Sequence, residues 1–329
     1  MTDTLVLVPV DNAAVDLADR VAEREPLTGR RRPFLERARA RTIPYLLLLP
    51  AALTLLVWTY RPLVETLRLS FYDWNMMPTS DRVWVGTDNY RDIVQLPELR
   101  RSLSVTGWMM LGLVPFTIVL PVVISLLTHR MRPRSRTLYR AAVFTPVLIT
   151  PVVAAAVWRW LLNTSGGAYQ KPIEWLGREP INWLREERTA LIAVILIAGW
   201  KMLGFATLMV SAGLSSIDSS YHEAAAIDGA SERRIRWRIT LPLLSPTLTF
   251  MGLMTVLLTA QWLFPLIDLL TQGGPIGATT NVYYLLYTMG FTSFDAGLSS
   301  AAGVLFFIAF GLLAMGCLKL MDRLSFYDN

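Results

Sequence analysis

Residues 190–214 read ALIAVILIAGWKMLGFATLMVSAGL and contain one charged residue, Lys201. An apolar helix of about 20 residues is long enough to cross a bilayer core of about 30 Å. Prolines inside such segments are expected to be tolerated, because neighbouring helices satisfy the freed backbone groups. Five further segments have the same character: 43–60, 103–128, 141–162, 243–268 and 300–320. The sequence therefore predicts an all-α polytopic membrane protein with six transmembrane helices.

The composition of the whole chain excludes several other classes of protein. Of its 329 residues, 53% are hydrophobic and 17% are charged, whereas soluble domains carry about 25% charged residues. This hydrophobicity also excludes intrinsic disorder. Cys317 is the single cysteine in the sequence, so a disulfide scaffold is excluded as well. The net charge of +6 comes with no readable nucleic-acid-binding module, and nucleic acid is not expected as a partner.

The distribution of basic residues predicts the orientation in the membrane. One set of alternating loops and tails carries 19 Lys and Arg residues and the other set carries 10. The segment 129–140 holds five arginines and no carboxylate, while 269–299 holds no basic residue. Because cytoplasmic loops are enriched in Lys and Arg, we expect both termini in the cytoplasm. The expected organisation is a tail at 1–42, a transmembrane domain at 43–320 and a tail at 321–329.

The motifs of the common membrane and soluble enzymes are missing from the sequence. It contains no GxxxxGK[ST] phosphate-binding loop, no HExxH metal motif and no GxSxG nucleophile elbow. With two histidines and one cysteine, it offers no common metal-ligand set. We therefore expect a chain that is not an enzyme, holds no metal or cofactor, and conducts a solute with energy supplied elsewhere.

The segment 219–242, named here the elbow loop, carries the most specific pattern. Ser220 and Glu223 have the spacing of a capping box and predict a helix start. Gly229 stands where a helix ends in the left-handed conformation, and Ser231 is expected to begin a second helix that leads through Leu241 and Pro242 into the fifth span. The two helices and the glycine predict a rigid projection on the cytoplasmic side; the alternative is an ordinary amphipathic loop.

The spacing of this loop resembles the EAA loop of binding-protein-dependent ABC importer permeases. The matching residues are Glu223, Ala224, Ala225, Asp228, Gly229, Ala230, Ile239, Leu241 and Pro242. Three further strings resemble the sugar and glycerol-phosphate branch of that family: LSFYDWN at 69–75, VG with DNY at 85–90, and GGP at 273–275. Two departures are the lack of the inserted outer domain found in one maltose permease subunit, and His222, for which the family suggests no role.

The resemblance implies a heteromeric importer that works by alternating access. Expected partners are a second homologous permease, two cytoplasmic ATPase subunits that bind ATP and Mg, an external solute-binding lipoprotein and membrane lipid. The nine matching residues would couple this chain to an ATPase subunit. The implied substrate is a sugar or oligosaccharide, with glycerol-phosphate or a glycerophosphodiester as the alternative. An ion-coupled secondary transporter and a membrane enzyme are rival classes, disfavoured by the lack of repeats, buried acids and catalytic groups.

Polar and aromatic residues at membrane depth are the candidates for the solute path. Lys201, next to Trp200, is either a path residue or a structural tie to a carbonyl or carboxylate, since an ionisable group at this depth is costly. Gln261, Trp262 and Asp268 interrupt the fifth apolar segment and offer an amide, an aromatic face and a carboxylate to a polyol. The alternatives are packing for Trp262 and an interfacial position for Asp268.

Overall fold

The computed structural model describes residues 34–324 except 130, 165, 178 and 180. Most of the two predicted tails, residues 1–33 and 325–329, lies outside this part of the chain. The described residues divide into two compact units, one ending at Pro62 and the other beginning at Leu63. The first unit contains α2 (Phe34–Leu55) and the π-helix η1 (Leu56–Tyr60), which together cover the first predicted apolar segment.

The second unit is almost entirely helical and begins within α3 (Arg61–Leu69). A two-stranded antiparallel hairpin pairs β1 (Tyr72–Asp73) with β2 (Val83–Trp84). The helices up to the fourth span are α4 (Asp88–Gln95), α5 (Pro97–Val114), η2 (Pro115–Val119), α6 (Leu120–His129), α7 (Pro133–Leu148), α8 (Pro151–Leu161), α9 (Gln170–Trp175) and α10 (Glu187–Ser215). The remainder are α11 (Ser219–Ile227), α12 (Glu232–Ile235), η3 (Arg236–Thr240), α13 (Leu241–Leu243), α14 (Ser245–Trp262), α15 (Phe264–Leu270), α16 (Val282–Tyr287), η4 (Thr288–Thr292) and α17 (Ala296–Leu324).

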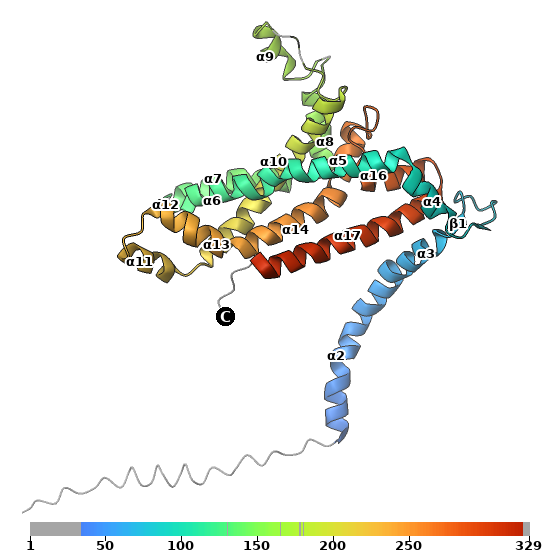
Figure 1. The fold of residues 1–329 in the computed structure, drawn as a ribbon, viewed down its shortest axis with the longest axis horizontal. Helices are drawn as coiled ribbons and strands as arrows, with labels where there is room; N and C mark the ends of the chain where they lie inside the picture. Colours follow the sequence, from blue (N-terminus) through green and yellow to red (C-terminus); the bar gives the residue numbers. More distant parts are fainter. Residues whose placement is uncertain (1–33, 130, 165, 178, 180, 325–329) are drawn as a thin grey trace, which may run out of the picture. The chain divides into compact units, whose positions relative to one another are not determined.

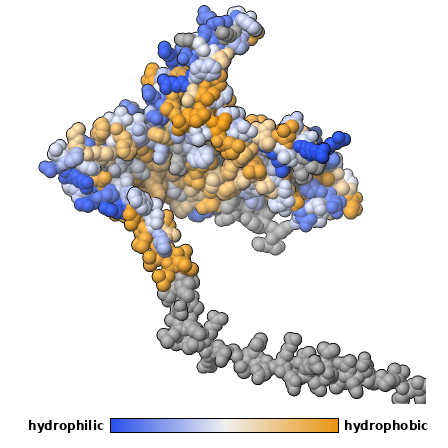
Figure 2. Space-filling view, turned by 180° about the vertical axis from the view of Figure 1, so that it is seen from behind, coloured by the Kyte–Doolittle hydropathy of each residue, from blue (hydrophilic) through white to orange (hydrophobic). Residues whose placement is uncertain are grey.

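Within the described residues, four continuous helical stretches are long and apolar enough to cross a membrane, and two bent helix pairs raise the number to six if each pair is one span. The continuous stretches are Tyr45–Leu69, Pro97–Thr128, Glu187–Ser215 and Ala296–Lys319. The surface of the bundle agrees with a membrane setting, because it is hydrophobic across the middle and hydrophilic at its two ends (Figure 2). The predicted fold class is therefore confirmed, while the number of crossings stays a prediction.

The third and fifth predicted spans are not the single helices that the sequence suggested. Helices α7 and α8 are bent by 92° at a break next to Pro151, where the missing N–H removes a helical hydrogen bond. The expected fifth span, 243–268, contains the end of α13, all of α14, a break at Leu263 and most of α15. Asp268 accordingly lies on the short helix α15, beyond the end of α14.

Small polar residues join the helices inside the bundle. The hydroxyl of Thr255 on α14 donates to that of Thr117 in η2 at 2.8 Å, and the Ser125 and Ser211 hydroxyls of α6 and α10 are 2.9 Å apart. Such bonds replace the hydrophobic driving force that lipid-embedded helices lack. The apolar core lies in the half away from the elbow loop, and its members include Met109, Val194, Leu266, Ile267 and Tyr284.

Two of the segments whose sequence resembles the family, 69–75 and 85–90, pack against each other at the β1 end of the bundle. The Asn89 side-chain amide donates to the carbonyls of Ser70 and Tyr72, both at 3.0 Å. The hydroxyls of Ser70 and Tyr90 are 2.6 Å apart. The hairpin and α4 therefore form one hydrogen-bonded cap, at the opposite end of the bundle from α11 and α12 (Figure 1).

Candidate coupling site and solute path

The first arm of the elbow loop is capped by a different residue from the one expected. Asp218 is the N-cap of α11, and its carboxylate accepts a hydrogen bond from the backbone N–H of Ser220 at 2.9 Å. That bond, with a second from the Ser220 side chain, holds the pKa of Asp218 below its usual range. The predicted capping box of Ser220 and Glu223 is wrong, because the helix begins at Ser219 and both residues lie inside it.

The elbow itself has the predicted glycine geometry. Gly229 has φ +73°, a left-handed conformation that costs a residue with a Cβ about 1–2 kcal/mol. The N–H of Ala230 donates to the carbonyl of Ala225 at 3.0 Å, and the N–H of Gly229 donates to that of Ala226 at 3.1 Å. This pair of bonds is the Schellman motif, which satisfies the last carbonyls of a helix. The predicted left-handed turn at Gly229 is confirmed.

The second arm starts at the expected place and is tied back to the first. Ser231 occupies the N-cap position of α12 but makes no capping bond with its side chain, and α12 continues directly into η3. His222 on α11 has Nε2 3.1 Å from the hydroxyl of Thr240 at the end of η3. His222, which the family resemblance left without a role, therefore joins the two arms across the elbow.

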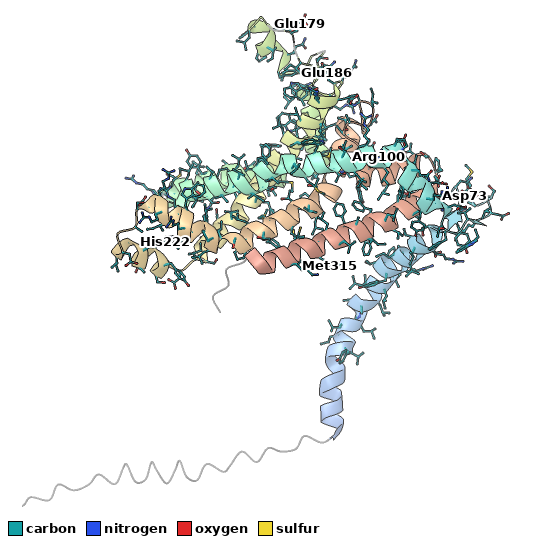
Figure 3. The ribbon with its side chains drawn as sticks, viewed as in Figure 1. Asp73, Arg100, Glu179, Glu186, His222 and Met315 are labelled. Carbon is teal, nitrogen blue, oxygen red and sulfur yellow. The ribbon has the colours of Figure 1, made fainter. Side chains whose placement is uncertain are left out.

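The residues that match the EAA pattern divide into an exposed set and a packed set. Ile227 is 86% exposed, and the exposed matching residues around it are Glu223, Ala224, Asp228 and Gly229. The buried or half-buried ones are Ala225, Ala230, Ile239, Leu241 and Pro242. His222 marks this end of the bundle, whereas Asp73 and Arg100 lie at the other end (Figure 3). Around Ile227 the first arm thus presents small side chains and the carboxylates of Glu223 and Asp228, and the exposed Tyr221 and Trp237 add two aromatic side chains to the loop.

Lys201 makes the contacts expected of a structural tie, one of its two predicted roles. The side chain lies on α10 and is 6% exposed. Its ammonium donates to the carbonyl of Pro146 at 3.1 Å and to that of Ile149, both at the break between α7 and α8. An unpaired cation at the centre of a bilayer costs about 2.5–3.5 kcal/mol on insertion scales, and these carbonyls offset that cost.

The other predicted path residues have separate partners in the structure. Trp200 packs edge-on against Trp158 of α8, with ring centroids 5.8 Å apart. The hydroxyl of Tyr284 donates to Asp268 at 3.3 Å; burial, followed by the charge of Asp268, raises the pKa of Tyr284 to about 12. Trp262 is 50% exposed at the end of α14. The side chain of Gln261 lies outside the described residues. These contacts do not gather the candidates into one cluster.

Sequence reasoning missed the buried threonines and the asparagine that lie at the same depth. Thr117, Thr255 and Thr259 are each no more than 2% exposed, and the amide of buried Asn281 donates to the Thr259 carbonyl at 3.4 Å. Thr255 and Thr259 are four residues apart, which places them on one face of α14. This spacing of four residues could have predicted a polar face on the helix. It was overlooked because the residues around the two threonines are aliphatic.

The helical bundle and its elbow loop define a class, the transmembrane subunits of binding-protein-dependent importers. Residues 40–325 match the family described as "Binding-protein-dependent transport system inner membrane component", and the chain belongs to that family. It is 33% identical over 268 residues to the trehalose/maltose transport system permease protein MalF of Thermococcus litoralis, covering 80% of this chain and 88% of that protein.

Further comparisons agree on relatives and on fold. The chain is 30% identical over 281 residues to the sn-glycerol-3-phosphate transport system permease protein UgpA of Escherichia coli O157:H7, covering 84% of this chain and 93% of that protein. The crystal structure of a bacterial ABC transporter involved in the import of the acidic polysaccharide alginate matches with a TM-score of 0.77 at 21% identity, over 88% of this chain and 98% of that chain. A structure of an alginate ABC transporter in complex with alginate pentasaccharide-bound periplasmic protein gives 0.77 at 20% identity, over 90% and 99%.

The predicted resemblance to the sugar and glycerol-phosphate permeases is therefore confirmed. The chain is a multi-pass membrane permease subunit of an ABC importer, a kind of subunit that is not itself catalytic and that works with ATPase and binding-protein partners. The rival classes, an ion-coupled secondary transporter and a membrane enzyme, are set aside on the same family match.

Proposed function

We propose that this chain carries a carbohydrate-like solute, delivered by an external binding protein, across the inner membrane by alternating access. The elbow loop is the observation that carries the proposal. It is a short hydrogen-bonded projection at one end of an apolar bundle, with an exposed Ile227 suited to a groove on a partner. Such a projection transmits a movement only if it is rigid, and the Gly229 turn and the contact between His222 and Thr240 make it so.

The proposed assembly contains a second homologous permease, two cytoplasmic ATPase subunits and an external solute-binding lipoprotein. ATP and Mg are bound by the ATPase subunits, and this chain holds no cofactor. The elbow-loop end of the bundle is cytoplasmic in this proposal, together with both termini. Four arginines between Arg233 and Arg238 at that end, and the absence of Lys and Arg from 269–299, support this orientation.

The orientation is tested with single cysteines in a Cys317→Ser background. Arg134→Cys is expected to react with a membrane-impermeant maleimide only after the membrane is permeabilised. Gly274→Cys in the GGP turn is expected to react from outside in intact spheroplasts. The reverse pattern for the pair would contradict the orientation, and with it the cytoplasmic position of the elbow loop.

Among carbohydrate-like solutes, we propose a sugar or oligosaccharide. The relative named for trehalose and maltose supports this class, and the relative named for sn-glycerol-3-phosphate supports the alternative. Lys201 was the cation in the sequence best suited to a phosphate group, but its ammonium binds two backbone carbonyls. A phosphorylated solute would therefore need a different cation, which removes the main residue-based reason to favour it.

The assembled transporter, purified through this subunit and reconstituted with its binding protein, tests the substrate class. Stimulation of ATP hydrolysis and uptake is measured with trehalose, maltose and sn-glycerol-3-phosphate as probes. We expect a sugar to stimulate both activities and the phosphate ester to stimulate neither. Stimulation by sn-glycerol-3-phosphate alone would contradict the sugar assignment, and an assembly that purifies without an ATPase subunit would contradict the proposed complex.

A further inference from the structure

The break in the third predicted span leaves backbone carbonyls without their helical donors. Helix α7 ends at Leu148, and α8 begins at Pro151, which has no N–H. The N–H of Val153 would serve the Ile149 carbonyl in a continuous helix; it donates instead to the hydroxyl of Thr150 at 3.3 Å. The Pro146 carbonyl keeps one local donor, the N–H of Ile149 at 3.3 Å, whereas the Ile149 carbonyl has lost its helical donor. Further donors to both carbonyls must come from outside their own helix.

Lys201 supplies those donors from a neighbouring span. Its ammonium bonds to the carbonyls of Pro146 and Ile149, which lie at the negative end of the α7 dipole. Ammonium has three donors and no acceptor, so one group serves both carbonyls at a point where lipid offers none. The lysine therefore acts as a C-terminal cap that is provided by another helix.

A second close contact fixes the same two helices. A Cβ placed on Gly204 of α10 would lie 2.4 Å from the carbonyl oxygen of Val143 and 2.8 Å from the Cα of Phe144. The α7 and α10 backbones therefore touch at Gly204, one turn along α10 from Lys201. Helix α7 is held to α10 by a backbone contact and by a charged hydrogen-bonded contact.

The two halves of the broken span belong to different parts of the bundle. Helix α7 packs mainly against α10, whereas α8 packs mainly against α15. Helix α10 ends at Ser215 and leads within a few residues into α11 of the elbow loop. Figure 1 shows α7 extending toward the elbow-loop end while α8 turns away toward α9. A displacement of the elbow loop is therefore passed to α10 and α7, and α8 follows through the break and through the contact of Trp158 with Trp200.

From these contacts we propose that Lys201 is a positioning residue of the transport cycle. It fixes α7, the first half of the third span, to α10. Residues 149–151 then form the hinge between α7, which moves with α10 and the elbow loop, and α8, which packs on α15. The proposal rests on the proposed alternating-access function for its consequence in transport. The hinge itself is a structural claim that is testable without a known solute.

The test uses pairs of spin labels on the full-length chain within the purified transporter in lipid nanodiscs. Leu138→Cys on α7 and Trp160→Cys on α8 replace side chains that are 72% and 59% exposed, in a Cys317→Ser background. The distance distribution between the labels is expected to be narrow in the parent and broad in Lys201→Met, which keeps the chain length but has no donor. Lys201→Arg restores donors and is expected to restore the narrow distribution. Lys319→Met, which removes an exposed lysine at the end of α17, is the matched control.

Gly204→Ala provides an independent second variant if Lys201→Met does not insert. It keeps the lysine but separates α7 from α10, and it is expected to broaden the distribution as well. Parent-like distributions in both Lys201→Met and Gly204→Ala would overturn the hinge proposal. A broad distribution in either inserted variant, with Lys319→Met unchanged, supports it.

Uptake of the solute identified for the parent distinguishes a positioning role from solute binding. Because conformational steps limit many transport and catalytic rates, Lys201→Met is expected to lower the maximal uptake rate by at least about tenfold. The concentration for half-maximal uptake is expected to stay unchanged, and Lys201→Arg is expected to recover the rate. A raised half-maximal concentration at an unchanged maximal rate would instead make Lys201 a path residue and overturn the proposal. The failure of every solute probe would contradict the proposed function while leaving the distance measurement intact.

Discussion

The elbow loop and the third span differ in what determines their backbone. At the elbow, Gly229 takes a left-handed turn closed by hydrogen bonds to Ala225 and Ala226, all within a few residues of sequence. At the span break, the Ile149 carbonyl accepts the ammonium of Lys201, more than 50 residues away, and the Pro146 carbonyl accepts it in addition to the N–H of Ile149. A helix cap that is made by neighbouring residues can therefore be predicted from a pattern in the sequence. A helix cap that is provided by another helix appears in the sequence only as an isolated polar residue.

The largest expected effect follows from replacing the elbow glycine. Among the described residues, apart from its own chain neighbours, nothing lies within 4 Å of a Cβ built at Gly229, so its requirement for glycine comes from the backbone angle. Gly229→Val is expected to redirect the second arm, because a β-branched residue at positive φ is strained by about 1–2 kcal/mol or more. Uptake and solute-stimulated ATP hydrolysis are expected to fall to background, measured beside the insertion level in the membrane.

The matched control for this variant is Gly229→Asn, because asparagine adopts the left-handed conformation more readily than other residues. It is expected to keep most of the coupling. If Gly229→Val transported as well as the parent, the elbow loop would not be the element that transmits movement. The local turn at Gly229 would then have no role in coupling.

The second prediction concerns the end of α14, where the sequence suggested an aromatic face for the solute. Trp262 is half exposed and lies outside the described apolar core. Trp262→Ala is expected to raise the solute concentration for half-maximal uptake about fivefold, as the loss of one aromatic contact would. ATPase co-purification is expected to be unaffected. Trp262→Phe, which keeps an aromatic ring, serves as control, and unchanged uptake in the alanine variant would make Trp262 a packing residue.

The sequence was sufficient for the elements whose determinants are local. Apolar length predicted the membrane-crossing class, and the Gly229 turn followed from its position after a run of alanines. The breaks at Pro151 and Leu263 were not predicted, because proline within an apolar segment is compatible with both a kinked and a straight helix. Likewise, nothing in the sequence indicated that Tyr284 would lie in the core, where it is 6% exposed. Its environment depends on α15, whose separation from α14 was not visible in the sequence.

A smaller effect on coupling is expected when Glu223 is replaced. The position of this residue in the structure differs from the one that the sequence predicted. It does not complete a capping box, and it lies exposed on the first arm. In the proposed complex it is a surface carboxylate facing an ATPase subunit, where an exposed ion pair contributes about 0.2–1 kcal/mol. Glu223→Ala is expected to lower ATPase co-purification about threefold, and to do so more strongly at low salt. Glu223→Gln, which keeps the shape, should lose as much; full retention by both variants would exclude a charged contact.

The smallest effect is expected at Asp218. It distinguishes the observed N-cap of α11, Asp218, from the cap that the sequence predicted, Ser220. Asp218 accepts the N–H of Ser220, and its pKa is lowered by that bond. A carboxylate with a lowered folded-state pKa contributes stability above its unfolded pKa and loses that contribution as the pH falls through the folded value. Asp218 is therefore ionised throughout the neutral range, and its capping role is independent of pH there.

Asp218→Ala is accordingly expected to reduce solute-stimulated ATP hydrolysis about twofold at neutral pH, through loss of the N-cap. Asp218→Asn keeps an acceptor and is expected to retain the parent activity. Ser220→Ala would remove the cap if the helix began where the sequence suggested, but it keeps the backbone N–H that Asp218 uses, so it is expected to have no such effect. A loss in Ser220→Ala equal to that in Asp218→Ala would return the cap to Ser220.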